Sequence, residues 1–252
     1  MPYAILQRSL AAPLVEGLAR AFRVVPQLRP VDAGAMARDA FGILVQGLDR
    51  DDAERLLEAL RAEGIEAEAV DQERLPVLPA PRPLRRAECH PLAFVAYDPL
   101  GRPTEFDWSH VLLVAAGLVR RTEFRHVVRE RVARYDYEGG PITVSEHSER
   151  EEEKLRPILE VFLDTAPGRY RIEGERFNYS YLGDRLHDDR MANFATIVQD
   201  CVLYTTRAVL NRGAATLQPG DRTLLAYPSR HAFEEEIVWL LWRQFASRVE
   251  AL

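Results

Sequence analysis

Lysine is almost missing from this chain. Lys154 is the only lysine among 252 residues, and arginine supplies the rest of the 33 basic side chains. Such a bias is typical of GC-rich bacterial genomes and indicates a bacterial origin. The alternative is a functional use of the planar guanidinium group, which recognises phosphates and carboxylates. Composition alone leaves both explanations open.

Cysteine and long apolar runs are also scarce. Cys89 and Cys201 lie far apart in unlike contexts, so we expect two reduced, buried thiols rather than a disulfide framework. The longest stretch without a charged residue covers residues 108–119, about 18 Å as a helix, whereas the hydrocarbon core of a membrane is about 30 Å thick. No basic region precedes the first apolar residues, as a secretory signal would require. We therefore expect no membrane span and a cytoplasmic location.

Clustered basic charge is missing too. The chain has 39 acidic side chains and a formal net charge of −6, and its arginines are scattered along the sequence. Proteins that bind nucleic acids or anionic lipid surfaces concentrate basic residues on one face or segment. We therefore expect no nucleic-acid partner, and the acidity also disfavours binding to anionic lipid.

No familiar catalytic motif occurs in the chain. The six histidines include no i, i+4 pair, and there is no Gly-x-Ser-x-Gly elbow, zincin helix or Cys-x-x-Cys pair. We therefore predict no catalytic residue and no cofactor, and an enzyme is not the favoured interpretation.

One polar cluster is a candidate for a metal site. His187, Asp188 and Asp189 stand at the predicted start of a helix, and an imidazole with two carboxylates can bind a divalent cation. Carboxylates at this position also stabilise a helix by capping it, whatever the protein does, and we favour that simpler explanation.

Residues 1–72 are predicted to form a small α/β domain. An apolar run at 41–47, an amphipathic helix that begins near Asp51 and ends at Gly64, and an alternating segment at 65–70 indicate a βαβ unit. A strand at 3–7 and helices at 13–22 and 32–39 would complete the layer. Residues 73–85 carry four prolines, which indicates a semi-rigid connector or a strap across the surface.

Residues 86–252 are predicted to form a β-rich domain with C-terminal helices. Strands are expected at 92–97, 104–108, 110–119 and 223–227, and the strand at 110–119 is either regular or has a bulge at Gly117. A basic segment followed by an acidic one suggests that residues 129–155 are an exposed excursion whose opposite charges attract each other.

The clearest pattern is a β-hairpin that leads into a helix at 157–213. Leu159, Val161 and Leu163 alternate on one strand, and Tyr170 and Ile172 can face them from the returning strand. The helix that follows is predicted to end at residues 211–213.

Two aromatic groups are candidate contact residues. Phe177, Tyr179 and Tyr181 alternate as on one strand face, where they would pack inside or line a ligand surface. Trp239 and Trp242 lie on a last helix, capped by Ser229, that is apolar nearly all round. Such a helix must be covered by its own domain or by a second subunit, so a homodimer is one prediction.

The layout of residues 86–213 resembles the pleckstrin-homology-like barrel of bacterial proteins. The resemblance rests on several antiparallel strands, a Trp108-x-x-Val111 entry to one of them and a helix afterwards. The chain departs from that fold in its further strand and in the helix at 229–251. The whole sequence, with its segment at 177–182 and Asn193-Phe194, is also similar to uncharacterised proteins of GC-rich bacteria.

The sequence thus predicts an α+β protein with either a barrel or an open sheet in its second part. Its predicted function is that of a non-enzymatic binding or scaffold protein acting through protein contact. One alternative is a metal-dependent hydrolytic enzyme that uses His187, Asp188 and Asp189. The other is a regulatory protein that holds a small ligand against Phe177 and Tyr179.

Overall fold

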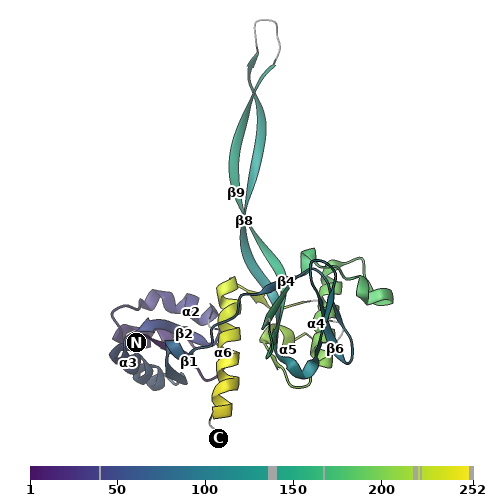
Figure 1. The fold of residues 1–252 in the computed structure, drawn as a ribbon. Helices are drawn as coiled ribbons and strands as arrows, with labels where there is room; N and C mark the ends of the chain where they lie inside the picture. Colours follow the sequence, from purple (N-terminus) through teal and green to yellow (C-terminus); the bar gives the residue numbers. More distant parts are fainter. Residues whose placement is uncertain (40, 136–140, 167, 218–220, 222, 250–252) are drawn as a thin grey trace.

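The structure is a computed structural model of the chain. It describes all residues except 40, 136–140, 167, 218–220, 222 and 250–252, and it describes only the backbone of 123–135, 141–152 and 245–249. Helices combine with antiparallel and mixed sheets, so the α+β class is confirmed. Two units flank the last helix, and a long hairpin projects from them (Figure 1).

The N-terminal unit is a three-stranded sheet with helices on one face. Its strands are β1 (Tyr3–Gln7), β2 (Ile43–Leu48) and β3 (Ala67–Asp71), in the order β2-β1-β3 with β1 antiparallel to both neighbours. Its helices are α1 (Val15–Ala21), α2 (Ala33–Asp39) and α3 (Arg50–Ala62), with short 3-10 turns at Phe22–Val24, Pro30–Asp32 and Gln72–Arg74. The predicted βαβ unit is therefore present in split form, because β1 lies between its two parallel strands. The cap of α3 is Asp49, whose carboxylate accepts a hydrogen bond from the Asp52 amide, rather than Asp51.

The second unit contains two sheets. The larger has the order β11-β8-β9-β10-β4, with β12 also paired to β8, and the smaller has the order β5-β6-β7. The strands are β4 (Arg82–Leu84), β5 (Ala87–Cys89), β6 (Ala93–Tyr97), β7 (Pro103–Asp107), β8 (Val111–Tyr135), β9 (Pro141–Leu163), β10 (Arg169–Glu173), β11 (Val209–Leu210) and β12 (Ala226–Tyr227). The helices are α4 (Arg190–Tyr204), α5 (Arg212–Ala215) and α6 (Arg230–Val249), with 3-10 turns at Trp108–His110, Gly174–Arg176 and Ser180–Arg185.

The larger sheet is open. Its edge strands β11 and β4 do not pair with each other, so the described strands close no barrel. The barrel is therefore not confirmed, and the described strands form the open sheet that was the alternative. The proline-rich segment supplies β4, which adds as a parallel edge strand to β10. A proline is tolerated there because an edge strand needs fewer backbone donors.

The predicted hairpin is confirmed in its register. Tyr170 pairs with Val161 and Ile172 with Leu159, in an antiparallel ladder between β9 and β10. The helix that follows is shorter than predicted, because α4 ends at Tyr204. Asn211 does not end a helix but begins one: its side chain accepts a hydrogen bond from the Ala214 amide at the start of α5.

Strand β8 has no bulge at Gly117. Its register irregularities lie between Val111 and Leu113 and between Val132 and Arg134. Gly117 has a different role, since a Cβ built there would lie 2.4 Å from the Tyr227 ring. Glycine at this position lets Tyr227 of β12 pack directly on the strand.

The segment expected as an excursion continues the strand ladder. Strands β8 and β9 pair from Val111↔Leu163 to Tyr135↔Pro141, so residues 129–135 and 141–155 are paired β-strands with one register irregularity between Val132 and Arg134. Beyond residue 120 the ladder extends about 50 Å at about 3.3 Å per residue. Figure 1 shows this hairpin arm, residues 120–156, standing clear of both units.

Helix α6 holds the two units together. Trp239 packs on Ala4, Leu6, Ile43 and Val70 of the N-terminal sheet, and its Nε1 donates to the Gln7 carbonyl at 2.7 Å. Nε1 of Trp242 donates to Glu68 at 3.2 Å. The opposite side of α6 packs on β8 and β9 through Phe233, Ile237 and Leu241. The apolar surface that suggested a homodimer is thus covered largely within the chain.

Candidate functional site: the hairpin arm and its base

The hairpin arm is a two-stranded ribbon without flanking strands. Among the described residues, the last pairing to a third strand is Val119 with Tyr227 on one side and Ile158 with Glu173 on the other. An isolated two-stranded hairpin is at best marginally stable in water, because it has no core to cover either face. The arm therefore presents two unpaired strand edges to any protein that approaches it.

A buried polar network fixes the base of β8. The Asn211 side chain donates to the Ala116 carbonyl and accepts from the Ala116 amide, at 3.0 and 2.9 Å. It also donates to the Tyr227 hydroxyl, which donates to Glu236 at 2.9 Å. Glu236 is fully buried and accepts the Arg212 backbone amide at 2.7 Å. Each of these polar side chains has hydrogen-bond partners, so the network holds β8 firmly against α5 and α6.

A second buried cluster fixes the base of β9. Glu160 is fully buried and accepts hydrogen bonds from Arg169 at 2.8 and 3.0 Å and from Arg171. Both arginines also donate to Glu234 of α6, at 2.6 and 3.0 Å, and Arg230 donates to the same carboxylate at 3.1 Å. The cluster holds three positive and two negative charges.

The two carboxylates of this cluster differ in pKa. Burial raises the pKa of Glu160 above its ordinary value, although Arg171 and Arg169 act in the opposite direction. Burial also acts to raise the pKa of Glu234, but hydrogen bonds and charge from Arg169 and Arg230 outweigh it and hold that pKa below its ordinary value. Glu234 is therefore the more firmly ionised of the two.

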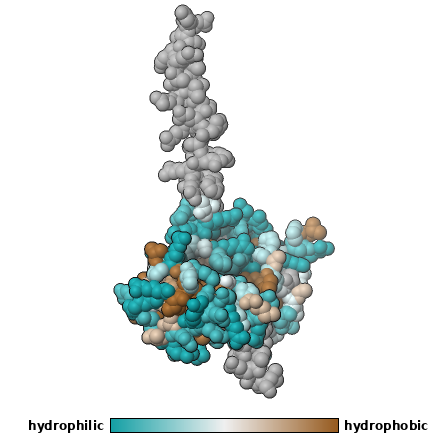
Figure 2. Space-filling view, turned by 90° about the vertical axis from the view of Figure 1, so that its left-hand side faces the viewer, coloured by the Kyte–Doolittle hydropathy of each residue, from teal (hydrophilic) through white to brown (hydrophobic). Residues whose placement is uncertain are grey.

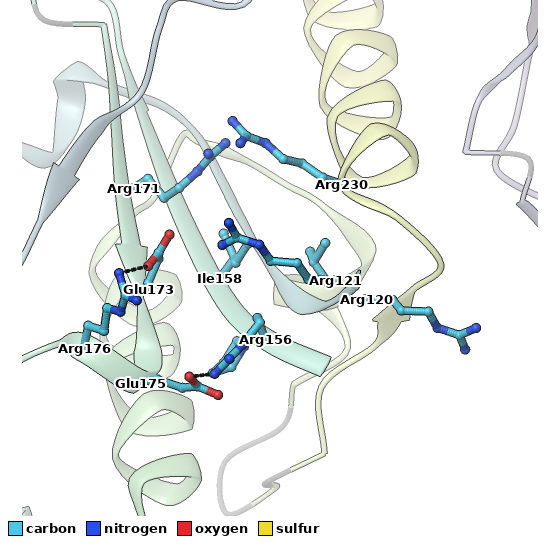
Figure 3. Close-up of a pocket in the computed structure, with 11 residues that line it drawn as sticks. Arg120, Arg121, Arg156, Ile158, Arg171, Glu173, Glu175, Arg176 and Arg230 are labelled. Carbon is cyan, nitrogen blue, oxygen red and sulfur yellow. Dashed lines mark ion pairs between the residues drawn. The ribbon is translucent and has the colours of Figure 1, made fainter. Parts of the chain in front are cut away.

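A pocket lined by arginines lies beside this cluster. It encloses about 180 Å³ between β8, β9, β10, the 3-10 turn after β10, and α6. Figure 3 shows most of its charged side chains around one hollow. The lining residues are Val119, Arg120, Arg121, Arg156, Pro157, Ile158, Arg171, Glu173, Glu175, Arg176 and Arg230. We call it the basic pocket.

The sequence-predicted metal candidates lie elsewhere and are exposed. The His187 amide donates to the Asn193 side chain at 2.7 Å, and Asp189 caps α4 by accepting the Met191 amide at 2.9 Å. Among the described residues no group of three or more His, Cys, Asp or Glu side chains is placed to hold a metal ion. His231 pairs with Glu235 on α6, and the side chain of His147 is outside the described part.

The aromatic candidates are part of the core. The strand expected for Phe177, Tyr179 and Tyr181 was wrong, because this segment forms irregular structure and a 3-10 turn. The Phe177 and Tyr179 rings are buried and meet edge to face at 5.1 Å. The Tyr181 hydroxyl donates to Asp200 at 3.1 Å, and burial raises the pKa of Tyr181. These contacts fit the packed inner face that the sequence also suggested.

The two cysteines meet in the core. Cys89 of β5 and Cys201 of α4 are free and buried, with their sulfur atoms 3.4 Å apart. Burial and the neighbouring Cys201 thiol raise the pKa of Cys89, so little thiolate forms at neutral pH.

We expect both thiols of the folded protein to react with Ellman's reagent at least about a hundredfold more slowly than in 8 M urea, because only the exposed thiolate is nucleophilic. The measurement is the absorbance of released thionitrobenzoate over time, with free cysteine as the control. Equal rates in buffer and urea would contradict the buried placement.

Sequence reasoning missed the basic pocket. Its six arginines come from five different elements, and the sole signal in the sequence was the arginine bias of the whole chain.

No protein-family model matches the chain, and no curated protein or solved structure is significantly similar to it. None of the helices in the described part is long and apolar enough to cross a membrane.

Proposed function

We propose that this protein is a non-enzymatic binding protein of the cytoplasm that holds a partner protein through its hairpin arm. The observation that carries the proposal is the arm itself: about 50 Å of two-stranded ribbon with unpaired edges, anchored at its base by two buried polar clusters. A rigid anchor with an exposed edge suits strand addition, in which a partner segment pairs with the edge.

The charges of the arm favour a different protein over a second copy. Residues 120–134 of β8 include six arginines and two glutamates, whereas residues 146–153 of β9 include five glutamates and one arginine. A two-fold symmetric contact would place like-charged strands edge to edge, which is destabilising. A β8-to-β9 contact between copies would be heterologous, so it would form a ring or a filament of many copies rather than a dimer. We therefore propose that an acidic extended segment of another protein pairs with the β8 edge.

The described surface outside the arm gives weaker support for a partner contact. The face of the molecule in Figure 2 is mostly hydrophilic with scattered apolar groups. Exposed large apolar side chains are spread over the sequence, among them Val31, Val77, Leu100 and Leu203. Single exposed apolar residues of this kind are normal and do not mark an interface.

The first test removes the arm. Thr122 and Glu153 pair directly, so an Asn-Gly turn can join them in place of residues 123–152. We expect the shortened protein to unfold within about 1 kcal/mol of the full chain, because the buried clusters lie outside the arm. We expect partner binding to be lost. Collapse of the body on deletion would show that the arm serves folding instead.

The second test locates the contact in the native cells. A photo-reactive amino acid at Val127 should give one discrete adduct with another protein, and the same group at the exposed body residue Val31 should give none. Arg125→Glu with Arg129→Glu on β8 should reduce the adduct at least tenfold, whereas Glu149→Arg on β9 should retain it. An adduct with the mass of two copies, or equal adducts from both sites, would overturn the proposal.

A further inference from the structure

The basic pocket has the composition of an anion-binding site. We propose that it binds the phosphate group of a small phosphomonoester, as a function separate from the partner contact of the arm. The inference rests on the convergence of the arginines, the local charge balance, the freedom of two guanidinium groups, and the size and walls of the hollow.

The arginines converge from separate elements. Arg121 comes from β8, Arg156 from β9, Arg171 from β10, Arg176 from the following 3-10 turn and Arg230 from the first position of α6. In Figure 3 the side chain of Arg121 extends into the middle of the group, and those of Arg171 and Arg230 extend toward each other. Several forked donors around one hollow suit an anion that carries three or more acceptor oxygens.

The local charge is positive even after every visible ion pair is counted. The lining has six arginines and two glutamates. Glu153, Glu160 and Glu234 pair with lining arginines, and Arg169 shares two of these carboxylates. Counted over the described side chains alone, two positive charges remain in surplus, which matches the charge of a phosphomonoester near pH 7. The N-terminus of α6, at Arg230, adds partial positive charge to the same place.

Two guanidinium groups are available to a ligand. Arg121 has no ion-pair partner among the described side chains, and Arg176 reaches Glu173 only at 3.9 Å, beyond hydrogen-bond distance. Arg171 is held in place by Glu160 and Glu234, so it offers a fixed charge at the back of the pocket. Of the two lining carboxylates, Glu175 is paired with Arg156, and Glu173 makes only the 3.9 Å contact with Arg176 among the described side chains.

The size of the hollow limits the ligand. About 180 Å³ is below the range of about 300–1,000 Å³ found for pockets that hold drug-sized molecules. A whole nucleotide would therefore leave most of its surface outside. Val119, Pro157 and Ile158 supply apolar wall beside the arginines. A phosphate that carries one small organic group fits both the positive charge of the arginines and the apolar wall.

The experiment is titration calorimetry of the full chain with phenyl phosphate, inorganic phosphate and benzoate at constant ionic strength. We expect phenyl phosphate to bind most tightly, because it fills both the charged and the apolar part, and benzoate to bind at least about tenfold more weakly. Arg121→Gln should weaken phenyl phosphate about tenfold, the size expected for losing one charge-assisted hydrogen bond. Arg176→Gln is a second variant that should also weaken the binding of phenyl phosphate.

An arginine outside the pocket provides the matched control. Arg102 is exposed just before β7, does not line the pocket, and pairs with Asp98 at 2.7 Å. Arg102→Gln removes the same charge from the surface and should change the affinity less than about twofold. Equal losses in the two variants would mean general charge attraction and would overturn the site. Equal binding of benzoate, or no heat from any probe, would overturn it as well.

Discussion

Replacing Glu160 with glutamine should lower the free energy of unfolding by about 3–5 kcal/mol. Glu160 is fully buried and receives hydrogen bonds from Arg169 and Arg171, which are themselves almost fully buried. The substitution leaves two guanidinium groups in the interior whose one remaining carboxylate partner, among the described side chains, is Glu234. An uncompensated buried charge costs far more than a lost surface ion pair, because water can no longer solvate it.

The melting temperature reports this effect. For a chain of this size we expect a decrease of roughly 10 °C, measured by circular dichroism, since each 1 kcal/mol corresponds to about 2–4 °C. Glu153→Gln is the matched control, because Glu153 pairs with Arg120 at the surface and such pairs contribute about 1 kcal/mol or less. Similar melting temperatures for the two variants would show that the Glu160 cluster is not the buried anchor of β9.

Several parts of the fold could be predicted from short-range sequence patterns. The ladder of β9 and β10 was predicted because Leu159, Val161 and Ile172 alternate on strands joined by a short turn. The strand order of the N-terminal unit was not predictable in the same way. A βαβ pattern predicts two parallel strands, but it does not reveal that the distant strand Tyr3–Gln7 lies between them.

The hairpin arm was missed for a physical reason. Strand prediction depends on a buried face, which produces alternation of apolar and polar residues. Residues 120–135 and 141–156 form a ribbon that stands clear of both units, and their sequence is rich in charged residues and resembles a solvated loop. The pocket was missed because Arg121, Arg171 and Arg230 meet only through the tertiary fold. The metal candidates show the opposite case. His187, Asp188 and Asp189 are adjacent in the sequence, but helix capping is enough to explain the position of Asp189.

Replacing Gly213 with alanine should destabilise the protein by about 3 kcal/mol or more, the upper end of the range for overpacking a core. A Cβ at this position would lie 1.9 Å from the Ala116 carbonyl oxygen and 3.0 Å from its carbon. The atom in the way is backbone, so it cannot rotate aside as a flexible side chain would. The carbonyl is also held by the Asn211 side chain at 3.0 Å, and Asn211 fixes the start of α5. To relieve this clash, α5 would have to move away from β8.

Urea unfolding measures this cost, and Gly34→Ala is its control. Gly34 lies inside α2, where a Cβ would meet only Val15 at 3.8 Å, so alanine should be neutral or stabilise the helix by up to about 1 kcal/mol. Because Asn211 joins Ala116 to α5, the Gly213 variant should also increase amide hydrogen exchange at residues 114–118. If it unfolds like the unmodified protein and keeps those amides protected, α5 does not hold the base of the arm. The rigid anchor on which the partner proposal depends would then rest on the Glu160 cluster alone.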